Sequence, residues 1–160
     1  MSGCVQKIIP ALAGDYSHLV IPLLNSAKDQ IDILMYQWKW YGHAGSSAIQ
    51  RLNLAFISAA RRGVKIRALL NLDHIGGPIS QINSRTETQL KAVGIETKHD
   101  FTGITSHAKM VLIDKEILVL GSHNFSARSM SGNNEASVII RGVDEVQPFQ
   151  KYFQRLWERY

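Results

Sequence analysis

The first hundred residues alternate between apolar positions at helical spacing and short continuous apolar runs. Leu19, Leu23 and Leu24 share one face of a predicted helix from Ser17 to Gln30, and the run from Ile31 to Trp38 then predicts a buried strand. Four further elements continue the alternation: a helix from Ser46 or Ser47 to about Arg62, a strand from Val64 to Asn71, a helix from Ser84 to Val93, and a short strand from Ile95 to Lys98. This order predicts a parallel or mixed sheet with helices on both of its faces.

The rest of the chain has a different pattern, in which strands follow one another directly. The apolar runs His107–Ile113 and Ile117–Leu120 flank a polar turn and predict a hairpin, and Glu135–Ile140 predicts another strand. Apolar and aromatic residues at helical spacing then predict a closing helix that Asp144 can cap and that runs to Tyr160. We therefore expect a single α/β domain spanning residues 1–160, with a mixed, mostly parallel sheet flanked by helices on both faces.

Composition narrows the class of protein. A chain of 160 residues with 45% hydrophobic residues has the size and apolar content of one domain with a substantial core. Its formal net charge of +5 favours polyanionic partners, although ordinary solubility would also account for such a charge. Cys4 is the only cysteine, which rules out an intramolecular disulfide and a zinc site built from several cysteines.

The sequence also bears on location. No segment reaches the roughly 18 apolar residues of a transmembrane helix. The N-terminus lacks a basic region followed by an apolar run, so it does not predict a signal peptide. We expect a cytoplasmic protein from the sequence as it stands, and a periplasmic or secreted one if a leader has been removed.

The segment TSHAKMVLIDKEILVLGSHNFS carries the most informative chemistry. Residues two apart on a strand point the same way, so His107 and Lys109 should project side by side. Ser122 and Asn124 can project from the end of the returning run, where Gly121 leaves the backbone unobstructed. An imidazole can act as a nucleophile, and lysine and asparagine can donate to the oxygens of a phosphodiester. A lone His-x-Lys pair is usually ordinary surface, so the interpretation depends on the complete set.

Read together, HAKMVLID and GSHN match the pattern H-x-K-x4-D-x6-G-S-x-N at every position. This pattern resembles the HKD signature of the phospholipase D superfamily. Two other stretches are similar to that family: AARRGVKIRALL resembles a helix–strand junction of its fold, and NNEASVII resembles the segment that carries a family glutamate, here Glu135. The resemblance extends from Leu19 to Tyr160.

The resemblance implies cleavage of a phosphodiester in two steps. One histidine attacks phosphorus and forms a covalent phosphohistidine, and a second histidine protonates the leaving alcohol and then activates water. Carried over to this chain, His107 is nucleophile or acid/base, Lys109 and Asn124 bind the phosphoryl oxygens, and Ser122 supports the phosphate pocket. Glu135 would orient a histidine through a carboxylate–imidazole hydrogen bond.

Asp114 and the cofactor requirement follow from the same resemblance. Asp114 belongs to the signature and hence to the predicted catalytic set, but its position at the turn favours a structural role. The family needs no metal because two lysines supply the charge neutralisation that a metal supplies elsewhere. We therefore expect neither a metal nor another cofactor.

The mechanism needs two histidines, whereas the chain has one motif. None of the other histidines has a lysine two residues further on; they are His18, His43, His74, His99 and His123. Larger family members carry two motifs in one chain, and this chain resembles the minimal single-motif bacterial nucleases. The resemblance thus implies a homodimer in which two motifs face each other across a twofold axis.

The fold does not choose among the substrates of the superfamily. Similar small single-motif chains are mostly nucleases, and the basic balance agrees, with seven candidate contacts to a phosphate backbone: Lys39, Arg61, Arg62, Lys65, Arg67, Arg85 and Arg128. We expect a metal-independent phosphodiesterase acting on DNA or RNA as a non-specific endonuclease. One alternative is a phospholipase D or phosphatidyl transferase acting on the headgroups of membrane lipid, which we favour less. The other is a non-catalytic nucleic-acid-binding module, which the intact motif disfavours.

Three aromatic residues follow the first predicted strand closely. Trp38, Trp40 and Tyr41 lie at or just after its end, where a sheet with helices on both faces is expected to have its binding cleft. Trp40 and Tyr41 could stack on bases, dip into a lipid interface, or pack in the core or a dimer interface, whereas Trp38 is expected in the core. Their loop, WKWYGHAGSS, is longer than in the minimal nuclease pattern, which bears on substrate preference rather than on the chemistry.

Overall fold

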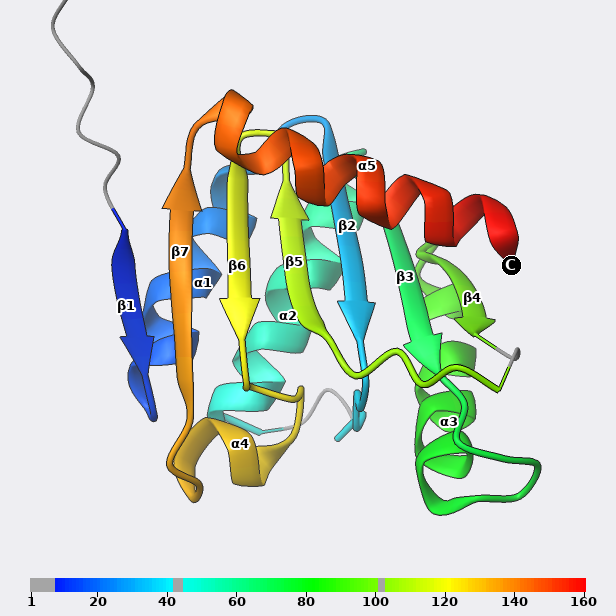
Figure 1. Cartoon of the computed structure of the whole chain (residues 1–160). Helices are drawn as coiled ribbons and strands as arrows, with labels where there is room; N and C mark the ends of the chain where they lie inside the picture. The colour runs from blue at the N-terminus through cyan, green and yellow to red at the C-terminus, as the bar shows by residue number, and fades with distance from the viewer. Residues whose placement is uncertain (1–7, 42–44, 101–102) are drawn as a thin grey trace, which may run out of the picture.

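A computed structural model describes residues 8–41, 45–100 and 103–160 of the chain (Figure 1). Its strands form one seven-stranded sheet, which in spatial order consists of β1 (Ile9–Leu12), β7 (Ala136–Arg141), β6 (Ile117–Gly121), β5 (Lys109–Ile113), β2 (Gln30–Met35), β3 (Lys65–Asn71) and β4 (Glu96–Asp100). The helices are α1 (Asp15–Ser26), α2 (Ala48–Arg61), α3 (Pro78–Ala92), α4 (Ala127–Ser131) and α5 (Val143–Arg159).

The sheet combines two kinds of strand pairing. β2, β3 and β4 are parallel, as expected for strands joined through the crossover helices α2 and α3. The other neighbours, β2–β5, β5–β6, β6–β7 and β7–β1, are antiparallel. The α/β class with a mixed sheet is confirmed, and the half of the sheet that carries the predicted motif is more antiparallel than the sequence led us to expect. A tight turn accounts for the β5–β6 pair, since such a turn can join only antiparallel strands, whereas β6 and β7 are joined through α4 and the other two antiparallel pairs join strands that are not consecutive.

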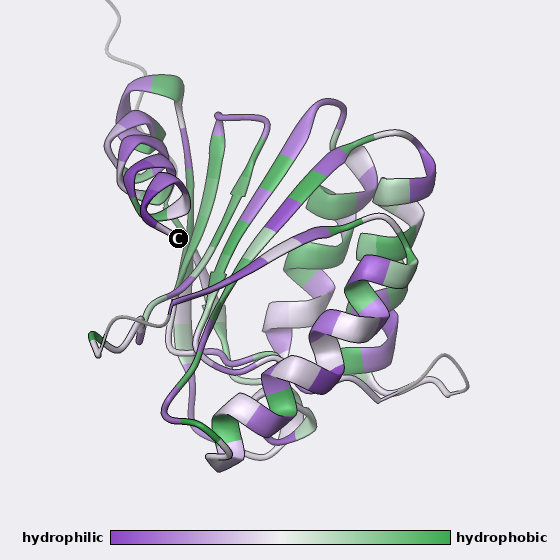
Figure 2. Cartoon of the chain, turned by 90° about the vertical axis from the view of Figure 1, so that its right-hand side faces the viewer, coloured by the Kyte–Doolittle hydropathy of each residue, from purple (hydrophilic) through white to green (hydrophobic). Residues whose placement is uncertain are grey.

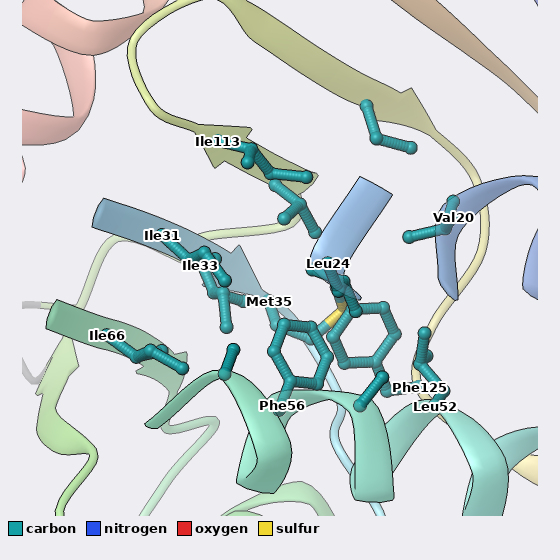
Figure 3. Packing of buried hydrophobic residues seen from close by; sticks show 14 of the residues in the cluster. Val20, Leu24, Ile31, Ile33, Met35, Leu52, Phe56, Ile66, Ile113 and Phe125 are labelled. Carbon is teal, nitrogen blue, oxygen red and sulfur yellow. The ribbon is translucent and has the colours of Figure 1, made fainter. Parts of the chain in front are cut away.

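Each face of the sheet is covered by helices, as the sequence predicted. Figure 2 shows α5 on one face and the other long helices on the opposite face. The larger buried cluster lies between the sheet and these long helices. It includes Ile33, Phe56 and Phe125 (Figure 3). A second cluster joins the opposite face to α5, where Phe153 and Trp157 pack on the sheet. Burying an aromatic or aliphatic side chain of this size contributes about 1.5–3 kcal/mol, so both clusters fix the position of β5.

β5 lies between β6 and β2 near the middle of the sheet, and its two ends define two edges of the molecule. Lys109 pairs with Met35 at the carboxyl end of β2, and Ile113 pairs with Ile31 near the start of β2. The β5–β6 connection turns through Asp114 and Lys115, whose φ angles of 52° and 61° are left-handed. Consecutive left-handed residues favour a tight hairpin whose twist matches the strands, so the predicted hairpin is confirmed.

Two elements were not expected from the sequence. β1 pairs with the outer edge of β7 and contains Pro10, which is tolerated because an edge strand has one side free of partners. α4 is a single short helical segment whose first turn is held by Ser126, which accepts a hydrogen bond from the amide of Ser129. Both elements are too short to produce a periodic pattern.

Several boundaries differ from the prediction. α3 begins at Pro78 rather than after Ser84, because proline is preorganised for the first helical position and Asp73 accepts hydrogen bonds from the amides of Ile79 and Ser80. α1 begins at Asp15 and ends at Ser26, α5 begins at Val143, β2 ends at Met35, β4 runs two residues further to Asp100, and β5 begins at Lys109 rather than at His107. Among the described residues, no helix has both the length and the apolar composition needed to cross a bilayer.

Candidate active site

His107 and Lys109 lie together at the start of β5, as their spacing predicted. His107 is exposed just before the strand, and Lys109 is largely buried as its first residue. The Lys109 ammonium lies 3.1 Å and 3.2 Å from the two ring nitrogens of His107 and donates to the His107 carbonyl oxygen at 2.6 Å. Burial lowers the pKa of Lys109, while the nearby Glu135 carboxylate opposes that shift. The pair therefore places a cation beside an accessible imidazole.

Tyr36 is part of this arrangement, and sequence reasoning missed it. Its ring packs against the His107 ring with centroids 4.6 Å apart, and the Lys109 ammonium lies 5.0 Å from the Tyr36 ring centroid. Tyr36 follows β2 directly, at the same edge of the sheet as Lys109. That position was the available signal, because the carboxyl ends of the parallel strands were expected to border the cleft. The ring limits the directions in which His107 can turn.

Gly121 and Ser122 close the other side of the site. Gly121 pairs with Lys109 on β5 and with Ser137 on β7, and a Cβ at this position would overlap the Ser137 hydroxyl and the Ala136 carbonyl oxygen. Ser122 donates a short hydrogen bond to Glu135 and accepts one from the amide of Ala136 at 3.0 Å. The glycine of the motif thus permits a close approach of strands that brings Ser122 and Glu135 together.

Glu135 is held by polar neighbours within its own chain. Its carboxylate accepts hydrogen bonds from Ser122 and from Asn133 at 2.9 Å. Burial alone would raise the pKa of Glu135, but hydrogen bonding by Ser122, Asn133 and Ser129, together with the electrostatic effect of nearby His123, outweighs burial and holds that pKa below its usual value. No described histidine hydrogen bonds to Glu135 within the chain. The predicted carboxylate–imidazole bond is therefore absent from a single chain as described.

Asn124 lies beside the segment that follows β2. Its neighbour Phe125 exchanges backbone hydrogen bonds with Gln37 and Lys39, so residues 36–40 and 122–126 run side by side. The side-chain oxygen of Asn124 is buried and has no hydrogen-bond partner among the described residues. An unpaired buried acceptor costs about 1–3 kcal/mol, and the amide nitrogen of the same side chain is the atom that can donate to a phosphoryl oxygen.

Asp114 lies at the opposite end of β5 from the rest of the motif. Its carboxylate accepts hydrogen bonds from the amides of Lys28, Asp29 and Gln30 at 2.9–3.0 Å. Burial alone would raise the pKa of Asp114, but these three donors outweigh it and lower the pKa. Asp114 ties the β5–β6 hairpin to the α1–β2 connection, which is a structural role. The geometry thus separates it from the other predicted catalytic residues.

The aromatic residues after β2 have structural contacts of their own. Trp38 is fully buried and donates to Asn53, which confirms its place in the core. Trp40 and Tyr41 are half-buried against the larger core cluster, and the Tyr41 hydroxyl accepts from the amide of Ala127 at the start of α4. These contacts fix the segment beside the candidate site. Stacking of Trp40 and Tyr41 on bases stays a prediction.

Two of the other histidines are engaged in the interior. His123 is buried, lies 2.8 Å from the Ser137 hydroxyl and 3.0 Å from the Ala13 carbonyl oxygen, and burial lowers its pKa. His99 bonds to Glu87 at 2.8 Å. His43 falls outside the described residues. Neither His123 nor His99 shares the accessible position of His107.

The seven basic candidates do not form one surface. Arg62 binds the carbonyl oxygen of Leu24, and Arg67 forms an ion pair of 2.7 Å with buried Asp32, so both have structural partners. Lys65 begins β3 beside the start of β2, at the edge opposite Lys109, and Arg61 ends the helix before it. Three candidates remain exposed in other positions: Lys39, Arg85 and Arg128. Arg155 and Arg159 of α5, which line a hollow together with His107, were not among the candidates.

A bound metal ion would need several ligating side chains close together. Within the described ranges, no cluster of three or more histidine, cysteine, aspartate or glutamate side chains has a suitable arrangement. Metal independence is thus left as a prediction for experiment.

Comparison with known proteins places this geometry in a family. A family model described as "Cardiolipin synthase, PLD-like domain" matches residues 20–157. Mitochondrial cardiolipin hydrolase of Mus musculus is 30% identical over 159 residues, which are 99% of this chain and 65% of that protein. The Xenopus laevis protein of the same name is 26% identical over 95% of this chain and 65% of its own length. The chain thus spans slightly less than two thirds of these relatives.

Solved structures show the same fold. Nuc from Salmonella typhimurium, described as a phospholipase D family member, superposes with a TM-score of 0.80 and 20% identity over 96% of this chain and 95% of that chain. NucT from Helicobacter pylori superposes with a TM-score of 0.73 and 19% identity, covering 96% of each chain. Because the family model covers residues 20–157, the chain belongs to the phospholipase D superfamily.

Proposed function

We propose that the chain is a metal-independent, non-specific endonuclease that hydrolyses nucleic-acid phosphodiester bonds as a homodimer. The observation that carries the proposal is the grouping of His107, Lys109, Ser122 and Glu135 at one edge of the sheet, with His107 exposed. This group contains a nucleophile, a buried cation and an oriented carboxylate. It contains one accessible histidine, whereas phosphohistidine chemistry needs two.

A second copy of the chain supplies the missing group. In the first step, an imidazole nitrogen of His107 forms a bond to phosphorus while the bond from phosphorus to the leaving oxygen breaks. His107 of the partner subunit gives its proton to that oxygen. In the second step the same partner imidazole takes a proton from water, whose oxygen attacks phosphorus and breaks the phosphorus–nitrogen bond. Lys109 and Asn124 donate to the non-bridging oxygens.

Glu135 fits this scheme because its carboxylate is available to accept a hydrogen bond from an imidazole. Its carboxylate is fixed by Ser122 and Asn133 and no described histidine of the same chain bonds to it. A carboxylate held in this way can accept a ring N–H and set the tautomer of an incoming imidazole. We infer that Glu135 orients His107 of the partner subunit.

Nucleic acid is the preferred substrate because the chain carries a formal net charge of +5, which suits a polyanion longer than one headgroup. Phospholipid is the second candidate, and a specific observation favours it: the curated relatives are named as mitochondrial cardiolipin hydrolases. Both substrates present the same phosphodiester to His107, so the bond chemistry does not distinguish them. The difference has to lie in the surface around the site.

A substrate panel tests the proposal. The wild-type chain is incubated with plasmid, single-stranded DNA, RNA, and vesicles of phosphatidylcholine or cardiolipin, each with and without excess EDTA. We expect cleavage of nucleic acid that is unchanged by EDTA and absent from the His107→Asn variant. Loss of cleavage in EDTA with rescue by Mg²⁺ would contradict the metal-free scheme. Lipid cleavage with intact nucleic acids would replace the endonuclease by the phospholipase.

A further inference from the structure

A hollow of about 200 Å³ adjoins His107, and neither Ser122 nor Glu135 is among its lining residues. Residues 104–108 form one wall, and the last turns of α5 form the other, with Arg155 and Arg159 among the lining residues. Tyr152 and Tyr160 complete that wall. Figure 1 shows how this comes about, because α5 crosses the sheet diagonally from β7 and ends on the side of β3 and β4. The hollow thus brings two arginines next to a candidate nucleophile 48 residues or more earlier in the chain.

The two arginines project along one line of the helix. Residues four apart are neighbours on a helix surface, and four residues rise by about 6 Å along the axis. The opposite face of α5 packs in the core through Phe153 and Trp157. Arg155 and Arg159 are both exposed, so their guanidinium groups are available to a ligand in the hollow.

Neither guanidinium is paired with an acidic side chain. Among the described residues, no aspartate or glutamate forms an ion pair with Arg155 or Arg159, in contrast to Arg67, which is paired with Asp32. The recorded contact of Arg155 is with the ring of Tyr152, 6.0 Å from its centroid. A guanidinium resting on an aromatic ring keeps its edge free to donate two parallel hydrogen bonds to a phosphate.

A second basic hollow in the molecule provides a contrast. It lies at the opposite end of the sheet and is lined by three lysines, Lys28, Lys65 and Lys115. Two carboxylates, Asp29 and Asp114, line the same hollow and offset those charges. No aspartate or glutamate side chain lines the hollow beside His107. Basic side chains line both hollows, but acidic side chains offset them only in the hollow at the opposite end of the sheet.

A simpler explanation covers part of this arrangement. Basic residues near the end of a helix are stabilised by its macrodipole, and Arg159 lies in the last turn of α5. That explanation predicts a contribution to stability and none to substrate choice. It also leaves unexplained why both arginines border the hollow that contains His107.

We propose that Arg155 and Arg159 bind a phosphate adjacent to the scissile one, so that a nucleic-acid strand is held across His107. This inference rests on the proposed endonuclease function and specifies how the site would prefer a chain of phosphates over a single phosphodiester. The scissile phosphate is bound by Lys109 and Asn124, and the neighbouring phosphate occupies the arginine hollow.

The test compares two substrates in one enzyme. Bis(4-nitrophenyl) phosphate carries one phosphodiester, and a short single-stranded oligonucleotide carries several. For the double variant Arg155→Gln/Arg159→Gln we expect kcat/KM on the oligonucleotide to fall about tenfold or more, since each arginine loses a charge-assisted contact. Turnover of the single diester should stay within about twofold, because its phosphate does not reach the hollow.

A matched control removes two positive charges elsewhere. Lys28→Gln/Lys115→Gln has the same net charge but alters the hollow at the other end of the sheet, and should leave both substrates unaffected. In a His107→Asn background, the slope of log affinity against log salt for the oligonucleotide should decrease by about 0.7 in the arginine variant, because one neutralised phosphate is lost. Each single arginine variant should show a smaller loss of the same kind.

The outcomes separate the two proposals. A wild-type chain that cleaves the oligonucleotide, with an arginine variant that loses both substrates equally or neither, overturns the phosphate subsite and leaves the endonuclease standing. An equal loss in the lysine control also overturns it, because the effect would then be one of net charge. A wild-type chain that cleaves the single diester but not the oligonucleotide overturns the endonuclease, and the subsite with it.

Discussion

The two ends of β5 carry residues of the same motif, but the polar groups at the two ends differ in how fully they are hydrogen bonded. At the Lys109 end, His107 is exposed, no described histidine hydrogen bonds to Glu135, and the Asn124 side-chain oxygen is unpaired among the described residues. At the other end, the Asp114 carboxylate accepts hydrogen bonds from three backbone amides. One end is prepared to meet groups from outside the chain, and the other is closed by the chain itself. A motif of this kind therefore combines reactive groups with the residue that fixes their framework.

The two ends of β5 are mechanically linked because the strand between them is rigid. β5 is a central strand packed on both faces, so a displacement at one end moves the other. Asp114 holds the hairpin against the α1–β2 connection and thereby sets the position from which Lys109 and His107 project. The reactive end needs this fixed frame because its own polar groups are not fully paired.

The largest expected effect comes from removing the imidazole at the open end. His107→Asn should lower kcat by about a thousandfold or more, since it removes the nucleophile and the acid together. Its unfolding free energy should stay within about 0.5 kcal/mol of wild type, because the residue is exposed. His18→Asn, which changes an exposed histidine on α1, is the control and should retain full activity. Activity near wild type in His107→Asn would move the chemistry to another residue.

The second prediction concerns the source of the second histidine. If each site takes one His107 from each subunit, a mixed dimer of wild type and His107→Asn lacks either the nucleophile or the acid. In an exchanged equal mixture, about a quarter of the activity should remain, since random pairing of a twofold dimer leaves that fraction with two wild-type chains. Energy transfer between labelled chains verifies the exchange. Half of the activity remaining after verified exchange would show that each chain holds a complete site.

At the closed end, the expected effect is on stability rather than on turnover. Asp114→Ala leaves three amide donors without an acceptor and should lower the unfolding free energy by about 2 kcal/mol. Urea unfolding measures this change, and kcat measured below the transition should remain within about twofold of wild type. A large fall in kcat with unchanged stability would place Asp114 in the chemistry and erase the contrast between the two ends.

The smallest effect is the pH dependence of that stability. The pKa of Asp114 is lowered in the folded chain, so the charged form stabilises the fold above its unfolded pKa, and this contribution is lost as pH falls through the folded pKa. The stability difference between wild type and Asp114→Ala should therefore be full at neutral pH and shrink below about pH 4. Urea unfolding of wild type and of Asp114→Ala, at neutral pH and below about pH 4, tests this expectation. A difference that grows in acid would contradict it.

Much of the fold could be predicted because its causes are local. The helical spacing of Ile49, Leu52 and Phe56 places α2 correctly, and Ser47 provides its cap. The hairpin and the adjacency of His107 and Lys109 follow from the period of a strand. Element boundaries were less predictable where distant groups decide them. α3 starts early because Asp73, outside the helix, satisfies its first amides.

The candidate site shows the same division. By itself, the sequence determined the order of the strands and helices other than β1 and α4, the pairing of His107 with Lys109, and the family, because these depend on residues close together in the chain. Tertiary structure decided that Tyr36 packs on His107, that Asp114 binds amides about 85 residues earlier, and that α5 brings its arginines to the site. Such neighbours depend on the order of strands in the sheet and on the angle at which α5 crosses it. Both are set by the packing of the whole core, and no local period in the sequence encodes them.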